Sequence, residues 1–314
     1  MTARWSAWSA TLALPKSVTL RHHSIEQRQV LLLRYQSANE TLWTEAAPLP
    51  GWSCDTLVDN RAALPQIQGL TPQQALSVDL PPALSTAVGL LTLPNCARRE
   101  PAVESNLLLL EDDDILGETV VNVGKRCYKV KVGRLPIDVD IARIQSLLAQ
   151  SCEHICFRLD ANQSWTYEDI HKLDAALGDE PRIAYVEEPL RPELSYQHWP
   201  SVTRLAFAHD ERLRQPDFKP DPHCSALVIK PTLLGWSRTQ DCHQIARQQG
   251  CAQVLSSSFE SLVGLNLLNN LARQWQLSTV QGLATADFFQ QQWHTPDAEN
   301  PLPIAPVFDV EQVL

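Results

Sequence analysis

Tyr128-Lys129-Val130-Lys131-Val132 is an apolar, β-branched stretch that carries two lysines two positions apart. Because successive side chains of a strand point to opposite faces, this spacing puts both ammonium groups on one face. Lysine is rarely buried without a partner, and two like charges a few ångström apart repel, so acidic groups have to lie close to them. The stretch therefore predicts a strand whose lysine-bearing face lines a charged site.

A strand-then-helix layout recurs four times after Lys131. Each repeat has a short apolar strand that ends in a charged residue, and the steps are 29, 27, 23 and 20 residues. A parallel strand with its crossover helix takes about 20 to 30 residues, and such units close into a barrel with catalytic groups at the carboxyl ends of the strands. One charge at a strand exit is usually only solvated, but five in succession predict a site formed by Lys131, Asp160, Glu187, Asp210 and Lys230.

Residues 1–98 differ in pattern from this repeat. We expect neighbouring strands over 18–21 and 29–35 joined by the polar stretch 22–28, and then a proline- and glycine-punctuated loop over 42–53. Residues 55–91 have a helical pattern that is broken at prolines. Strands followed by helices predict a separate α+β domain that caps the barrel mouth.

The barrel is expected over residues 99–287, and the tail 288–314 is expected to return to the cap. The acidic run 111–114 lacks the ligand spacing of a calcium loop, so we interpret it as a solvated loop and helix start. Ser257 and Glu260 fit a capping box at a helix start, which could also hold a carboxylate. Residues 279–283 are predicted to form the last strand of the barrel.

Composition narrows the class of protein. The 314-residue chain is 44% hydrophobic and carries a formal charge of -10, which argues against nucleic acid or an anionic membrane as a partner. No apolar run has the length of a membrane span, and the eight cysteines are scattered as in a reduced protein. We therefore expect a cytoplasmic protein that acts on a small molecule. The oligomeric state is left open, with a monomer allowed.

The three predicted carboxylates have a clear chemical use. Asp160, Glu187 and Asp210 are hard oxygen ligands on three successive strands and suit an octahedral Mg²⁺. Lys131 and Lys230 would flank the ion from opposite sides. This arrangement suits removal of a proton α to a carboxylate, because the enediolate that results needs positive charge around it. A lysine base needs a pKa well below about 10.4, and Lys129 and the dication would lower the pKa of Lys131.

The ordered motifs resemble those of the enolase superfamily, in its muconate-lactonising branch, whose sites combine a Lys or His base with Mg²⁺. Among its members, the chain is most similar to the dehydratases of menaquinone biosynthesis. The resemblance covers most of the chain. It is carried by Lys129-Val130-Lys131-Val132-Gly133, Arg158-Leu159-Asp160-Ala161-Asn162, Glu187-Glu188-Pro189-Leu190, Asp210-Glu211, Val228-Ile229-Lys230-Pro231-Thr232 and Ser256-Ser257-Ser258-Phe259-Glu260.

The resemblance implies an α+β cap over a (β/α)₇β TIM-like barrel and a role for each motif residue. Lys131 would take the α-proton and return it to the departing hydroxyl, Lys230 would stabilise the enediolate, and Lys129 would lower the pKa of Lys131 and touch the carboxylate. The implied reaction is water loss from 2-succinyl-6-hydroxy-2,4-cyclohexadiene-1-carboxylate. The implied Mg²⁺ ligands, for which Mn²⁺ is a possible substitute ion, are Asp160, Glu187 and Asp210. The residues implied to orient substrate or ligands are Arg158, Asn162, Ser256, Ser257 and Gly282.

Three departures and two rival interpretations accompany this resemblance. Thr44 replaces a usual glycine, Arg212 replaces a common serine, and no acidic residue follows Gly282 within 283–285. These positions affect substrate contacts and cap fit. The same two lysines would also serve an N-acylamino acid racemase or a dipeptide epimerase. A barrel that only binds ligands is the third option, and it predicts damage to the five charged positions, which are all intact.

Overall fold

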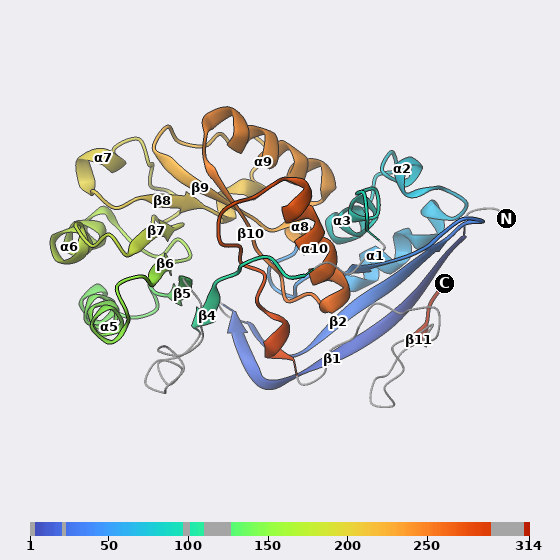
Figure 1. Ribbon diagram of the computed structural model, residues 1–314, viewed down its shortest axis with the longest axis horizontal. Helices are drawn as coiled ribbons and strands as arrows, with labels where there is room; N and C mark the ends of the chain where they lie inside the picture. The colour runs from blue at the N-terminus through green and yellow to red at the C-terminus, as the bar shows by residue number, and fades with distance from the viewer. Residues whose placement is uncertain (1–3, 21–22, 97–100, 110–126, 290–310) are drawn as a thin grey trace.

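The computed structural model describes residues 4–20, 23–96, 101–109, 127–289 and 311–314. It contains two units, an antiparallel sheet with helices beside it and a curled parallel sheet surrounded by helices (Figure 1). The expected fold class, a TIM-like barrel with an N-terminal α+β cap, is confirmed. None of the helices in these ranges is long and apolar enough to cross a membrane.

The cap sheet has the strand order β11-β1-β2-β3 and is antiparallel throughout. Its strands are β1 (Arg4–Leu20), β2 (His23–Gln36), β3 (Thr41–Ala46) and β11 (Glu311–Gln312). Two sequence expectations were wrong here, because residues 23–28 belong to β2 and 41–46 form β3. The stretch 24–28 is polar but places Ile25 and Arg28 in the interior, so composition concealed a strand.

The end of the chain lies on the cap sheet. β11 pairs with β1, with Gln312 opposite Trp8. The described residues 311–314 therefore lie on the cap, and the rest of the expected return of 288–314 stays a prediction. The expected domain boundaries stay predictions, because 97–100 and 290–310 lie outside the described residues, as does the acidic run 111–114.

The cap helices begin where proline or threonine favours a helix start. Thr56 and Thr71 each form a capping box, and Pro72 and Pro82 stand in first turns. The expected proline breaks are confirmed. The helices are α1 (Leu57–Ala63), η1 (Leu64–Ile67), α2 (Pro72–Ala75) and α3 (Pro82–Leu90).

The barrel sheet is parallel and runs in chain order from β4 to β10. Its strands are β4 (Leu107–Leu109), β5 (Cys127–Lys131), β6 (Cys156–Asp160), β7 (Ile183–Glu187), β8 (Phe207–His209), β9 (Cys224–Ile229) and β10 (Ala252–Leu255). The expected strand over 279–283 is reduced to two bridged residues. Gln281 bridges Ser105 and Gly282 bridges Ser256, which joins the two edges of the sheet.

Helices cover the outside of this sheet (Figure 1). α5 and α6 bury apolar residues at helical spacing, such as Ile144 with Leu148 and Ile170 with Leu173. The helices are α5 (Ile137–Gln150), α6 (Tyr167–Leu177), α7 (Trp199–Val202), η3 (Glu211–Arg214), α8 (Pro231–Leu234), α9 (Trp236–Gln249), α10 (Leu262–Gln274) and η4 (Ala286–Phe288).

The expected capping box at Ser257 was wrong. The N-cap of α10 is Ser261, whose hydroxyl accepts from the backbone N–H of Val263. Ser257 instead contacts Thr285, and Glu260 accepts from the backbone N–H of Ser258. The helix therefore begins four residues later than the motif indicated, and Ser257 is left to face the barrel mouth.

Candidate active site

Strand alternation builds the site in two layers inside the barrel. The upper layer contains the five predicted charged residues, at or directly after the ends of β5 to β9. The layer two residues earlier on each strand is formed by Lys129, Arg158, Tyr185, Ala208 and Val228, and it supplies the floor. Period-two alternation places both layers on the same face of the sheet. The functional side chains therefore lie at, or directly next to, the ends of rigid strands.

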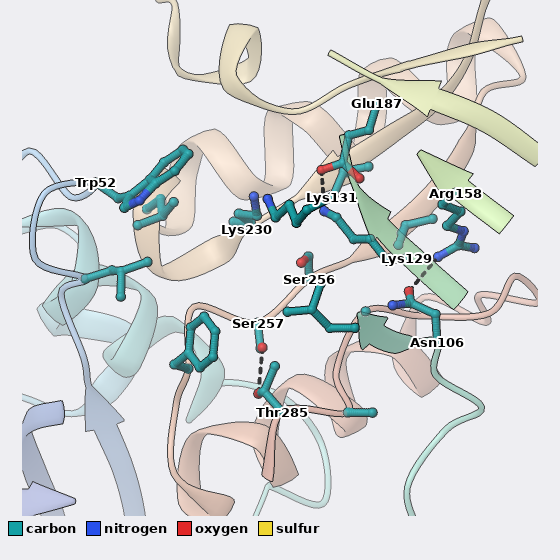
Figure 2. A pocket seen from close by; sticks show the side chains of 18 of the residues that line it. Trp52, Asn106, Lys129, Lys131, Arg158, Glu187, Lys230, Ser256, Ser257 and Thr285 are labelled. Atoms are coloured by element: carbon teal, nitrogen blue, oxygen red, sulfur yellow. Dashed lines mark hydrogen bonds and ion pairs between the residues drawn. The ribbon is translucent and has the colours of Figure 1, made fainter. Parts of the chain in front are cut away.

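Ammonium and carboxylate groups pair directly across the barrel mouth. Lys129 Nζ lies 2.8 Å from Asp160 Oδ2 and 2.6 Å from Glu187 Oε1. Lys131 Nζ lies 2.6 Å from the same Asp160 oxygen, and Lys230 forms an ion pair with Asp210. The three carboxylates are almost completely buried. Three amines thus balance three acids in a dry place, as buried charges require. Figure 2 shows the lysine side chains converging.

A second contact orients Lys131. Its Nζ donates to Asn162 Oδ1 at 2.8 Å, and Asn162 Nδ2 donates to Glu211 Oε1 at 2.9 Å. The chain Glu211–Asn162–Lys131 therefore fixes the amide and aims the amine. Asn162 was predicted to orient substrate or ligands, and in the structure it contacts the amine of the predicted base.

The site shifts the pKa of its members in opposite directions. Burial, helped by the positive charges of Lys129 and Lys230, lowers the pKa of Lys131 despite the nearby Asp160. Burial opposes the charged form of Lys129 too, but Asp160, Glu187 and Asp210 together raise its pKa well above the ordinary value. The expected lowering of the pKa of Lys131 is confirmed, with burial as the largest cause and Lys129 as a contributor.

The three acids suit a dication in chemical type. Burial, with the charges of Asp160 and Asp210, raises the pKa of Glu187 to about 8, so the carboxylates are close enough to repel one another. Hard oxygen donors that share a dry site are what Mg²⁺ prefers. As the side chains lie, however, no three His, Cys, Asp or Glu residues of the described ranges form a group that could hold a metal ion. Each carboxylate instead turns toward a lysine.

The remaining predicted residues line the pocket beside this cluster (Figure 2). Arg158 donates to Asn106 Oδ1 at 3.0 Å and to the carbonyl of Val280 at 2.6 Å. Ser256 and Ser257 follow β10, and the Ser257 and Thr285 hydroxyls lie 2.7 Å apart. A Cβ at Gly282 would stand 3.2 Å from the Ser256 hydroxyl, so the glycine keeps this wall open.

The outer part of the pocket is apolar and comes partly from the cap. Leu49 and Trp52 of the loop after β3 face Leu233 and Phe259 of the barrel. Arg214 Nη1 donates to the carbonyl of Trp52 at 2.7 Å. The pocket therefore combines a charged inner end with an apolar mouth, which suits a small molecule that carries both a carboxylate and a ring.

Known proteins match the chain along most of its length. Residues 115–305 match the family described as Enolase C-terminal domain-like, and residues 3–99 match MenC, N-terminal domain. An o-succinylbenzoate synthase of Pectobacterium atrosepticum is 35% identical, with 96% of each chain covered. The chain belongs to the o-succinylbenzoate synthase family.

Solved structures agree in fold. An o-succinylbenzoate synthase of Thermosynechococcus elongatus BP-1, described as complexed with Mg in the active site, has a TM-score of 0.72 at 24% identity and covers 93% of this chain and 95% of its own. A dipeptide epimerase of Enterococcus faecalis V583 in complex with Mg and L-Leu-L-Tyr has a TM-score of 0.78 at 20% identity, with 94% of each chain covered. At these identities the likeness establishes the fold of the barrel and cap. It does not establish which reaction the chain catalyses.

The three departures from the o-succinylbenzoate synthase family pattern have different structural consequences. Thr44 donates to the carbonyl of Ala87 at 2.9 Å and so joins β3 to α3 within the cap. Arg212 donates to the carbonyl of Leu194 at 2.8 Å, away from the pocket. Of the three, only the segment after Gly282 that lacks an acidic residue reaches the pocket, through Ala284 and Thr285.

The structure brings together most of the predicted site. The predicted residues that line the pocket are Lys129, Lys131, Arg158, Glu187, Lys230, Ser256, Ser257 and Gly282. Asp160, Asp210 and Asn162 do not line this pocket, but each contacts a lysine that does. Sequence reasoning did not single out Asn106, Tyr185 or Thr285 for the pocket. Tyr185 could have been found, because it stands two positions before Glu187 and therefore shares its face.

Proposed function

We propose that this chain is a Mg²⁺-dependent o-succinylbenzoate synthase, a carbon–oxygen lyase that dehydrates 2-succinyl-6-hydroxy-2,4-cyclohexadiene-1-carboxylate in menaquinone biosynthesis. The observation that carries the proposal is the pair of lysines, Lys131 and Lys230, on either side of three buried carboxylates. Membership of the family supports the choice of substrate. The apolar outer pocket and the charged inner end suit a ring with two carboxylates.

Lys131 is proposed as the base. Its amine would take the proton from the ring carbon that bears the carboxylate, and the electron pair of that C–H bond would move into the carboxylate as an enediolate. The adjacent C–O bond would then break, and the hydroxyl would leave as water with the proton that Lys131 carries. A lowered pKa makes the neutral amine more available, and Asn162 aims it.

Lys230 and Lys129 are proposed to work through charge. Lys230, across the site, would stabilise the enediolate without moving a proton. Its raised pKa, due to Asp210 acting against burial, suits a group that stays charged. Lys129 would remain an ammonium next to the substrate carboxylate and hold down the pKa of Lys131. Buried cations beside developing negative charge give the largest electrostatic benefit.

Asp160, Glu187 and Asp210 are proposed to hold Mg²⁺, which supplies positive charge beside the substrate carboxylate when bound. Lys129, Lys131 and Lys230 all pair with these acids in the structure, so metal binding requires amines to change partners. Arg158, Ser256, Ser257 and Gly282 would orient the substrate from the pocket wall. Mn²⁺ as a substitute ion and a cytoplasmic location stay predictions, and the oligomeric state stays open.

The direct test is an assay with purified protein, Mg²⁺ and the cyclohexadiene substrate. Ultraviolet absorbance should change as the diene becomes an aromatic ring, and mass spectrometry should identify o-succinylbenzoate. Chelation of divalent ions should abolish the reaction and Mg²⁺ should restore it. An inactive protein that nevertheless binds Mg²⁺ would contradict the proposal.

A racemase or epimerase remains the second candidate, since an epimerase shares the fold. Lys230→Arg separates the two. A racemase that uses both lysines should lose proton exchange from one face of its substrate. A dehydratase with one base should still exchange the proton that Lys131 handles, which proton NMR in deuterated water would detect.

A further inference from the structure

Arg28 is a fully buried arginine whose guanidinium donates to four backbone carbonyls. It lies on β2 of the cap and is 0% exposed. Its guanidinium donates to the carbonyls of Ala47 at 2.6 Å and Pro48 at 2.8 Å. It also donates to the carbonyls of Ser258 at 3.2 Å and Phe259 at 3.3 Å. One side chain thus joins two segments from different domains.

Both segments continue into the pocket wall. Ala47 and Pro48 lead into the loop that presents Leu49 and Trp52, while Ser258 and Phe259 follow the pocket residues Ser256 and Ser257. Arg28 donates two hydrogen bonds to each of these segments. This guanidinium is therefore one of the links that set the distance between cap wall and barrel wall, beside the bonds Arg214–Trp52 and Ser261–Glu45.

The barrel segment has a backbone conformation that needs support. Phe259 has a φ of 59°, in the left-handed region that side chains with a Cβ rarely adopt. Its carbonyl accepts from Arg28 Nε, and its ring lines the pocket. Arg28 therefore stabilises the strained turn that directs an apolar side chain toward the substrate.

Burial lowers the pKa of Arg28 to about 10, and the nearby Glu260 and Glu45 offset only part of this shift. Glu45 accepts from the backbone N–H of Ser261 at 2.9 Å, and Glu260 accepts from the backbone N–H of Ser258 at 2.6 Å. The N–H groups of the guanidinium can thus all donate to backbone carbonyls. A lysine could keep the charge but, with three donors on a single nitrogen, could not span four carbonyls.

We propose that Arg28 is a positioning residue that sets the width of the substrate pocket, by holding the cap loop 47–52 and the barrel loop 256–259 at a fixed separation. The inference rests on the proposed dehydratase function for its kinetic readout. It assigns Arg28 no contact with substrate. Its effect should therefore fall on substrate binding more than on the chemical step.

The test compares Arg28→Lys and Arg28→Met with Arg34→Met. Arg34 is on the same strand but bonds within the cap, to Ser6 Oγ, with its guanidinium 5.1 Å from the Trp8 ring centroid. For Arg28→Lys we expect a KM about tenfold higher with kcat within about threefold of wild type. Arg28→Met should show the same split more strongly. Arg34→Met should leave KM unchanged even if it lowers stability.

Hydrogen–deuterium exchange of the full chain without substrate provides a second readout. Both Arg28 variants should accelerate amide exchange in residues 47–53 and 256–261, while α5 and α6 of the barrel stay at wild-type rates. Unchanged exchange in either segment, or an unchanged KM in Arg28→Lys, would overturn the inference. If wild type proves inactive as a dehydratase, the proposed function fails, and the exchange result alone decides the role of Arg28.

Discussion

Two buried charged clusters in this protein are built in opposite ways. The catalytic cluster, formed by Lys129, Lys131, Lys230, Asp160, Glu187 and Asp210, pairs amines directly with carboxylates beside an open pocket. The interface cluster, formed by Arg28, Glu45 and Glu260, satisfies each charge with backbone groups and hydroxyls, away from the pocket. The first set can exchange partners when a ligand arrives, whereas the second is fixed by the main chain.

The difference shows how the same kind of residue serves chemistry or structure. Removing one partner of a buried ion pair leaves an uncompensated charge, which is costly unless a new ligand compensates it. In the catalytic cluster a metal ion and an anionic substrate can do so. The interface cluster is almost completely shielded from solvent, so its charges keep their main-chain and hydroxyl partners and hold the two domains in register.

The largest expected effect is at Lys131. Lys131→Met removes the proposed base, and kcat should fall by about 10³-fold or more, because a positioned acid–base group contributes about 10² to 10⁴. Steady-state ultraviolet kinetics measure this loss. Circular dichroism and Mg²⁺ titration of the variant serve as controls for folding and metal binding. A variant that keeps a tenth of wild-type turnover would show that the catalytic cluster has another base.

A smaller loss is expected at Asn162, which contacts the amine of Lys131. Asn162→Ala should lower kcat about 10- to 100-fold through misplacement of the amine, with little change in KM. Asn270→Ala is the matched control, since Asn270 is a buried asparagine that bonds to the carbonyl of Pro94 and does not line the pocket. Equal kinetic losses in both variants would mean that Asn162 acts only through stability.

A third effect concerns the interface cluster and appears in stability rather than turnover. Burial, with a contribution from Glu260, raises the pKa of Glu45 from 4.5 to about 7. Between these values the folded chain keeps a proton that the unfolded chain has released, so this group makes stability fall as pH rises from 4.5 to 7. At about 1.36 kcal/mol per pKa unit, the loss is about 3 kcal/mol.

Glu45→Gln should remove this component. The free energy of unfolding is measured by urea denaturation with a chelator present. Between pH 4.5 and pH 7, the free energy of unfolding of the variant should fall by about 3 kcal/mol less than that of wild type. Glu40→Gln, an exposed carboxylate beside the same sheet, should follow wild type. Parallel curves for wild type and Glu45→Gln would contradict the raised pKa and with it the closed nature of the interface cluster.

Prediction from sequence succeeded where a single side-chain periodicity determined which residues share a face. Alternation on β5 to β9 placed Lys131, Glu187 and their partners on one face, and the barrel follows from the strand–helix repeat. It failed where local signals compete with tertiary contacts. The polar residues 23–28 form a strand because their pairing with β1 overrides composition, and Ser257 loses its capping role because Ser261 bonds to Glu45 from the cap. Arg28 carries no local signal, since its partners at 47–48 and 258–259 are distant in sequence.

The most direct test of the account is a crystal structure of the protein with o-succinylbenzoate and Mn²⁺, which locates the ion by anomalous scattering. The account predicts one peak about 2.2 Å from oxygens of Asp160, Glu187 and Asp210, with Lys129 and Lys230 turned away from these acids and the amines of Lys131 and Lys230 on opposite sides of the ring. A peak that contacts fewer than two of these carboxylates, or both amines on one side of the ring, would contradict it.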